Sequence, residues 1–100
     1  MSRRKFDLAF SVSAESDIDD ILAYTLINWG ERQLSEYKKI LEAALKAIEK
    51  NPKVGRIRDD LRREYRSYHF GKHLIFFRIE GTTVFISRVL HERRDFARGL

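Results

Sequence analysis

The residues most able to do chemistry lie near the end of the chain, where an apolar run leads into a histidine and several charges. Residues 83–90 alternate as in a strand buried on one face, and His91, Arg93 and Arg94 follow. A histidine can act as a general acid or base near neutral pH. The alternative, which we favour, is a ring packed at a strand end, because the sequence fixes no carboxylate or tyrosine partner beside it. With Arg88, the cluster predicts a cationic surface on a rigid support.

A second group of cations lies in the polar connector around residues 53–66. Its arginines are Arg56, Arg58, Arg62, Arg63 and Arg66, interspersed with Asp59, Asp60 and Glu64. Guanidinium groups suit a phosphate- or carboxylate-binding edge. The alternative is a solvated loop whose opposite charges pair locally for about 0–1 kcal/mol each.

The net charge of +5 is unevenly distributed. Residues 1–51 hold eight Lys/Arg and nine Asp/Glu, whereas residues 52–100 hold twelve and six. A cationic half beside a nearly neutral half implies an anionic partner. The absence of cysteine excludes disulfides, thiolate metal sites and cysteine nucleophiles, and it favours the cytoplasm. No apolar run approaches the length of a membrane span, so no membrane association is expected.

The elements expected to position these residues begin with a half-buried strand over residues 6–10. Ser13 or Ser16 then caps a helix whose apolar stripe runs from Ile18 to Trp29, and Gly30 stops it. A second amphipathic helix runs from about Glu31 to Asn51-Pro52. Two helices joined so tightly predict an antiparallel αα-hairpin.

Three further strands are expected at residues 65–70, 73–80 and 83–90, separated by Gly71-Lys72 and Gly81-Thr82. The predicted fold is therefore α+β in the order β-α-α-β-β-β, with the αα-hairpin packed on one face of a mainly antiparallel four-stranded sheet. At 100 residues, the chain suffices for one small domain covering residues 1–100. The aromatic residues Tyr65, Tyr68 and Phe70 are expected to face the helices.

Several other residues are predicted to be structural. Asp17, Asp19 and Asp20 fall near the positive end of the first helix, and no metal or other cofactor is predicted. His69 and His73 lie too far from other ligand types to suggest zinc. Trp29 is expected to fill the open end of the hairpin against the sheet, with an exposed partner anchor as the alternative.

The whole pattern resembles the ParE-type toxins of the RelE/ParE superfamily of toxin–antitoxin modules. The matching residues, in chain order, are Ala14, Asp17, Ile18, Tyr24-Thr25, Trp29-Gly30, Tyr37, Asn51-Pro52, Gly55, Asp60–Arg62, Tyr65–Ser67, His73–Arg78 and Arg88–Asp95. Phe77 stands where the family typically has tyrosine. The resemblance covers nearly the whole chain and implies the same strand and helix order.

The resemblance implies a non-enzymatic toxin that binds DNA gyrase and is neutralised by a ParD-like antitoxin. Contact with the target is expected through Arg88, His91, Arg93 and Arg94. Contact with the antitoxin is expected through Tyr24, Trp29, Tyr37, Arg62, Arg66 and Arg78. Sequence-specific binding to nucleic acid is not expected, because no predicted helix has a basic face suited to a groove.

The alternative implied by the superfamily is a RelE-like endoribonuclease that cuts mRNA on the ribosome. Arg62, Arg78, Arg88 and His91 could form part of its catalytic set. RelE-like sites often add a tyrosine near the C-terminus, whereas Phe96 is the only aromatic residue after His91. A phenyl ring cannot exchange a proton, so the nuclease hypothesis is weakened.

Overall fold

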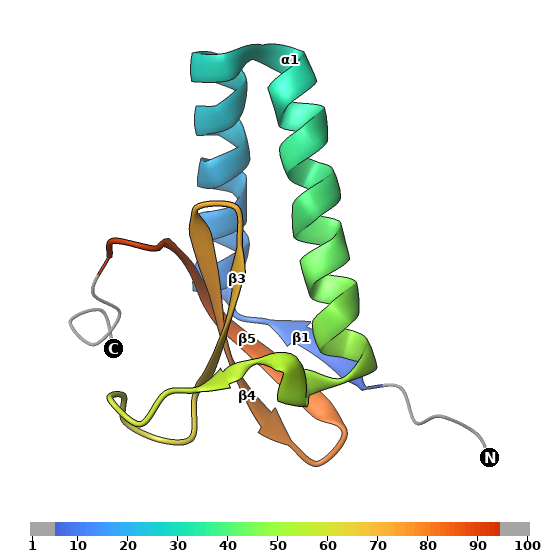
Figure 1. Cartoon of the computed structure of the whole chain (residues 1–100), viewed down its shortest axis with the longest axis vertical. Helices are drawn as coiled ribbons and strands as arrows, with labels where there is room; N and C mark the ends of the chain where they lie inside the picture. The colour runs from blue at the N-terminus through green and yellow to red at the C-terminus, as the bar shows by residue number, and fades with distance from the viewer. Residues whose placement is uncertain (1–5, 95–100) are drawn as a thin grey trace.

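A long, sharply bent helix covers one face of a twisted sheet and extends well beyond it (Figure 1). The computed structural model describes residues 6–94. Its elements are β1 (Asp7–Phe10), α1 (Val12–Lys50), the 3-10 helix η1 (Pro52–Val54), β2 (Arg56–Ile57), β3 (Arg66–Phe70), β4 (His73–Glu80) and β5 (Thr83–His91). The predicted α+β class is confirmed, and the three C-terminal strands lie within one residue of their predicted bounds.

The helix α1 begins earlier than the sequence suggests. Ser11 is its N-cap, with extended backbone angles and a side-chain oxygen that accepts a hydrogen bond from the Ala14 N–H at 2.9 Å. Ser13 and Ser16, the predicted caps, lie inside the first turns instead. The prediction was wrong because β1 ends at Phe10, which leaves a single residue between strand and helix.

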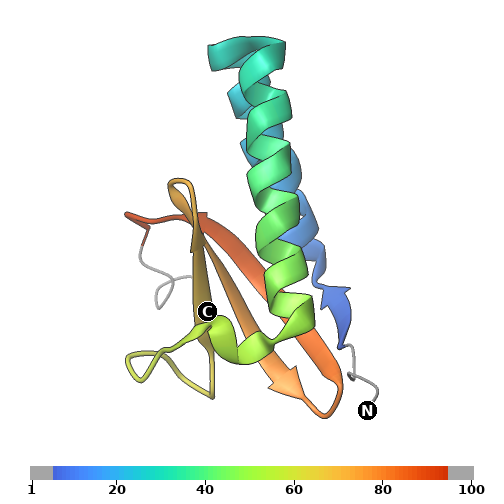
Figure 2. The same cartoon turned by 45° about the vertical axis from the view of Figure 1, so that its right-hand side comes forward.

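Gly30 bends α1 sharply. Its φ of 88° lies in the left-handed region that favours glycine, and it is the one residue of α1 with non-helical backbone angles. The two limbs on either side of it run next to each other in opposite directions (Figures 1 and 2). The predicted αα-hairpin of two separate helices is not confirmed as such, because the structure has one long helix with a kink at Gly30.

The sheet has five strands, not the predicted four, in the order β1-β5-β4-β3-β2. It is mixed: β1 lies parallel to β5, and the other three pairings are antiparallel. The additional strand β2 has only two residues and lies in the polar connector, so it is too short to show an alternating pattern. The parallel pairing arises because α1 carries the chain across the sheet between β1 and the later strands.

Apolar residues are buried on both faces of the sheet. The larger cluster lies between α1 and the sheet, and its most buried residues include Ala14, Ile48, Phe77 and Ile86. On β4, alternate residues point to opposite faces, so Phe76 belongs to a second cluster. That cluster consists of Leu61, Tyr65, Phe76 and Leu90, with Leu74 packed against it. The connector therefore covers the face that α1 leaves open, and Tyr65 faces this second cluster instead of the helix.

Candidate functional site

A bulge in β5 joins this strand to the start of α1. Phe77 pairs with Ile86 and Phe76 with Arg88, which leaves Ser87 as an extra residue in β5. The Ser11 hydroxyl donates to the Ser87 carbonyl at 2.7 Å, while the Ser11 N–H donates to the Ile86 carbonyl at 3.0 Å. The same serine that caps the helix therefore also fixes the bulge.

Arg88 follows the bulge and forms a two-pronged ion pair with Asp17 of α1. Its Nε and Nη2 atoms donate to the two carboxylate oxygens at 2.7 and 3.0 Å, and the Val89 N–H donates to Oδ2 at 3.0 Å. The two side chains are only 21% and 13% exposed. The hydrogen bonds to Asp17 raise the pKa of Arg88, so its charge is permanent. The structure thus engages Arg88 in an internal contact.

His91 is the exposed last residue of β5, and Arg93 and Arg94 lie in the exposed turn that follows. The Glu92 N–H donates to the Lys72 carbonyl at 2.8 Å, which ties this turn to the β3–β4 turn. Within it, the Arg93 N–H donates to His91 Nδ1 at 3.2 Å and the Arg94 N–H donates to the His91 carbonyl at 2.9 Å. Neither arginine side chain forms an ion pair within residues 6–94. Phe96 lies outside the described residues.

A cluster of histidine and tyrosine rings supports this turn. Tyr37, on the second limb of α1, hydrogen-bonds through its hydroxyl to His73 Nδ1 and accepts the Lys72 N–H at 3.1 Å. The rings of His73 and His91 meet edge to face with centroids 5.4 Å apart. A Cβ atom at Gly71 would lie 2.6 Å from the Tyr37 hydroxyl oxygen, so this close approach requires glycine.

Burial shifts the pKa values of two rings in this cluster. It raises the pKa of Tyr37 and lowers the pKa of His73, and the neighbouring His91 lowers the latter further. Close by, His69 Nε2 lies 2.8 Å from Glu92 Oε1. Among the described residues, no group of three or more potential ligands is arranged to hold a metal ion.

Sequence reasoning missed this cluster because it depends on strand register. A regular two-residue turn would place Leu90 opposite His73, but the extra residue Ser87 shifts the register so that His91 takes that position. Tyr37 comes from an element 36 positions away in the sequence. The one available signal was Gly71, which marks a turn where another side chain approaches closely.

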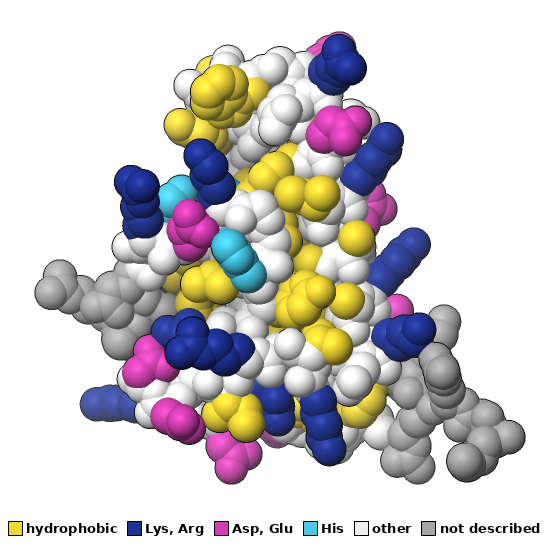
Figure 3. Space-filling view, in the orientation of Figure 1, with side chains coloured by type: hydrophobic (Ala, Val, Ile, Leu, Met, Phe, Trp, Pro, Cys, Tyr) yellow, Lys and Arg dark blue, Asp and Glu magenta, His cyan; other side chains and the backbone are white. Residues whose placement is uncertain are grey.

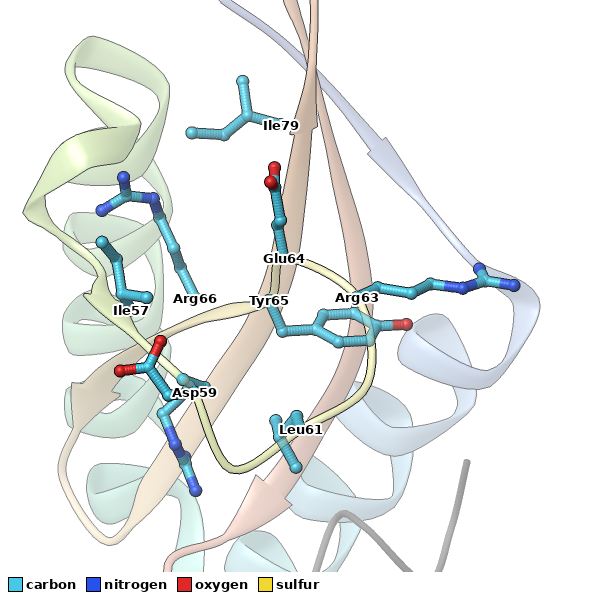
Figure 4. A pocket seen from close by; sticks show the side chains of 9 residues that line it. Ile57, Asp59, Leu61, Arg63, Glu64, Tyr65, Arg66 and Ile79 are labelled. Atoms are coloured by element: carbon cyan, nitrogen blue, oxygen red, sulfur yellow. The ribbon is translucent and has the colours of Figure 1, made fainter.

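The arginine-rich connector borders an open hollow of about 480 Å³, which is lined by the connector and by residues of β3 and β4 (Figure 4). Arg58 forms a two-pronged pair with Asp60, at 2.9 and 2.7 Å, and this pairing lowers the pKa of the carboxyl. Arg66 donates to the Gly55 carbonyl at 2.9 Å, while Arg62 is exposed. Part of the connector therefore pairs locally, as the alternative interpretation expected.

Arg78 lies beside this hollow and far from the histidines. Its Nη1 is 2.8 Å from Glu80, and its guanidinium lies over the rings of Tyr65 and Phe85. Within the described part of the chain, its buried Nε has no hydrogen-bond partner. His91 lies opposite His73, and His73 is five positions from Arg78 on β4. At the usual rise of a strand, this places Arg78 roughly 17 Å from the position facing His91. Arg78 and His91 of the predicted nuclease set are therefore not brought together.

The tip of α1 carries an exposed apolar patch, which Figure 3 shows at the top of the molecule. Tyr24, Ile27 and Trp29 are 63%, 81% and 68% exposed. The prediction that Trp29 packs against the sheet was wrong, because the limbs of α1 extend past the sheet (Figure 2). Tyrosine and tryptophan are among the side chains that most often anchor protein interfaces. No helix within residues 6–94 is long and apolar enough to cross a membrane.

Sequence comparisons identify the family. Residues 8–96 match the family described as the ParE toxin of type II toxin–antitoxin system, parDE. Toxin ParE1 of Mycobacterium tuberculosis is 35% identical over 91 residues, covering 90% of this chain and 93% of that relative. Toxin ParE1 of Caulobacter vibrioides is 38% identical over 79 residues, covering 79% and 81%.

Solved structures share the fold. A chain from the chromosomal ParDE TA system of P. aeruginosa has a TM-score of 0.74 at 17% identity, covering 88% of this chain and 97% of that chain. A chain of the toxin–antitoxin complex RelBE2 from Mycobacterium tuberculosis has a TM-score of 0.60 at 27% identity, covering 87% and 98%. From the family match and the identity to these relatives, this chain belongs to the ParE toxin family of type II toxin–antitoxin systems.

Proposed function

We propose that this toxin acts in the cytoplasm by binding DNA gyrase, catalyses no reaction itself and is neutralised by a ParD-like antitoxin. The observation that carries the proposal is the exposed turn with Arg93 and Arg94, fixed at the end of β5 and free of ion pairs within residues 6–94. Unpaired guanidinium groups on a rigid support suit recognition of an anionic surface. His91 contributes by shaping this turn. Arg88 contributes indirectly, because its pair with Asp17 holds β5 against α1.

The separation of the cations and histidines favours binding over catalysis. An endoribonuclease needs a base, an acid and cations converging on one phosphate. Arg78 lies roughly 17 Å along β4 from the position facing His91, and Arg88 is paired with Asp17. His91 Nδ1 already accepts the Arg93 N–H.

One observation keeps a RelE-like, ribosome-dependent endoribonuclease as the second candidate. The Tyr37–His73–His91 cluster places proton-exchanging groups beside Arg93. A mechanism using this cluster would differ from the one predicted from the sequence, because Arg62 and Arg78 would take no part.

The antitoxin is proposed to cover two surfaces. One is the apolar tip of α1, with Tyr24 and Trp29 as anchors. The other is the arginine-lined hollow, where Arg62 and Arg66 supply charge and Arg78 underlies the lining residue Tyr65. Tyr37 is half-buried under the β3–β4 turn, so only part of its side chain is available to a partner. An antitoxin segment that is disordered alone and folds on this surface fits both regions.

The decisive experiment uses the purified toxin without antitoxin in two parallel assays. We expect it to inhibit DNA supercoiling by gyrase and to leave mRNA intact on ribosomes. Cleaved mRNA with normal supercoiling would replace the gyrase proposal with the endoribonuclease. In a third assay, a co-expressed ParD-like antitoxin should co-purify with the toxin and abolish the inhibition. An antitoxin that fails to bind would contradict the neutralisation proposal alone.

A further inference from the structure

The hydrogen bonds around Tyr37 define how His73 is protonated. The hydroxyl oxygen accepts the Lys72 N–H, so its own proton is available for His73 Nδ1. A histidine that accepts through Nδ1 is neutral and carries its proton on Nε2. The geometry at Tyr37 therefore fits the neutral form of His73.

His91 uses the same atom in the same way. Its Nδ1 accepts the Arg93 N–H, and this bond shapes the turn that presents Arg93 and Arg94. Because the two histidine rings lie 5.4 Å apart, a proton added to one ring places its charge directly against the other. Phe70 stacks on His73 with centroids 5.7 Å apart, so one side of this ring is closed to water.

From these contacts we propose that Tyr37, His73 and His91 form a proton-sensitive latch that holds the Arg93–Arg94 turn in place. In the closed latch, Tyr37 donates to neutral His73, whose ring supports His91, and His91 in turn accepts from Arg93. A proton bound to His73 Nδ1 removes the acceptor of the Tyr37 hydrogen bond. It also places a positive charge against the His91 ring. Tyr37 and His73 are therefore positioning residues for the cationic turn. The effect of the latch on gyrase rests on the proposed function, whereas the latch itself does not.

Other titratable groups act on His73 from the neighbouring strands. A positive charge on His91 of β5 or on His69 of β3 favours the neutral His73 ring. Glu92, in the turn after β5, opposes them, and its carboxylate lies 2.8 Å from His69 Nε2. Burial, and then the neighbouring His91, lower the pKa of His73 below its ordinary value. The unfolded chain therefore binds this proton more readily, so the closed latch is stable above about pH 6.5 and weakens as the pH falls below it.

Nuclear magnetic resonance can follow the latch directly. We expect the amide signals of Arg93 and Arg94 to shift between pH 8 and pH 5 with the same midpoint as the His73 ring. In His73→Asn, the side-chain oxygen can accept the Tyr37 hydrogen bond but does not titrate. The pH-dependent shift of the Arg93 and Arg94 amide signals should therefore disappear in this variant. His73→Gln provides a second non-titrating variant should the first fail to fold. His69→Gln is the matched control and should retain the response. The latch proposal would be contradicted if the Arg93 and Arg94 amide signals shift with a midpoint different from that of the His73 ring. It would also be contradicted if they titrate unchanged in the folded His73→Asn variant.

A gyrase inhibition assay then tests whether the latch affects binding to the target. Wild type and His73→Asn are compared at the same pH, so the pH dependence of gyrase cancels. Between pH 8 and pH 5, wild type should lose at least threefold more inhibitory potency than the variant. Equal losses would show that the latch does not control target binding. If neither protein inhibits gyrase at any pH, the proposed function fails, while the resonance measurement still decides whether the latch exists.

Discussion

At its base, α1 presses Ala14, Ala44 and Ile48 into the main core, whereas at its tip Ile27 and Trp29 are largely exposed. The apolar residues recur with the same helical period at both ends. The difference lies in the sheet, which faces only the base of the helix (Figures 1 and 2). An amphipathic pattern therefore identifies a face that must be covered, but it does not say whether the protein or a partner covers it.

The arginines near the end of β5 repeat this contrast over a short distance. Arg88 is turned inward to Asp17, whereas Arg93 and Arg94 are exposed. We therefore expect substitutions at the base of α1 and at Arg88 to affect folding, and substitutions at the tip and beyond β5 to affect partners.

The largest expected effect comes from Ile48→Ala at the base of α1. Removing this fully buried side chain should lower the free energy of unfolding by about 2–5 kcal/mol. The matched change Ile27→Ala at the tip should stay within about 0.5 kcal/mol. Denaturant unfolding of both variants measures the difference. A comparable cost at Ile27 would mean that the tip is packed in solution.

The next effect concerns Arg88→Ala, which leaves the largely buried Asp17 carboxylate with only the Val89 N–H as its described partner. We expect a loss of roughly 1–3 kcal/mol in unfolding free energy, measured by denaturant unfolding.

The double variant Arg93→Ala/Arg94→Ala should unfold as wild type does, within about 0.5 kcal/mol, yet lose gyrase inhibition. Unchanged inhibition by this stable double variant would remove the exposed turn from the mechanism.

A smaller effect is expected for Trp29→Ala at the tip. Its affinity for the ParD-like antitoxin should fall at least tenfold, equivalent to about 1.4 kcal/mol, without a change in stability. Val12→Ala, at a position that is also largely exposed but lies at the base of α1, is the matched control and should bind normally. Calorimetric titration of the three toxins measures this. Equal affinities would exclude the tip from the antitoxin surface.

The smallest effect is expected for His91→Gln at pH 8, where the latch is closed in wild type. Glutamine keeps an acceptor for the Arg93 N–H, so gyrase inhibition should change only a few fold. Removal of a general acid or base typically reduces the rate 10²–10⁴-fold. A loss of that size in the folded variant, measured as growth arrest and mRNA cleavage, would favour the endoribonuclease.

Local patterns in the sequence were enough to predict β3, β4, β5 and the bend at Gly30. Each depends on neighbours in the chain: alternation, glycine turns and helical spacing. The missed features depend on distant residues. Arg88 and Asp17 are 71 positions apart, β2 exists only through its pairing with β3, and the exposure of Trp29 follows from the length of the sheet. The cationic ending was predicted from residue types, but no local pattern distinguishes the internal Arg88 from the exposed Arg93.

The parallel pairing of β1 with β5 also bears on how the toxin is made. Each pair in this ladder joins residues 76 positions apart, from Asp7 with Thr83 to Phe10 with Ile86. A chain still growing on the ribosome has β1 and α1 long before it has the strand that lies between β1 and the rest of the sheet. Contacts so distant in sequence form late in folding. A chain interrupted before residue 83 therefore lacks Val84, Ile86 and Val89 of the main core and has no partner strand for β1, so the toxin folds only after β5 has been made.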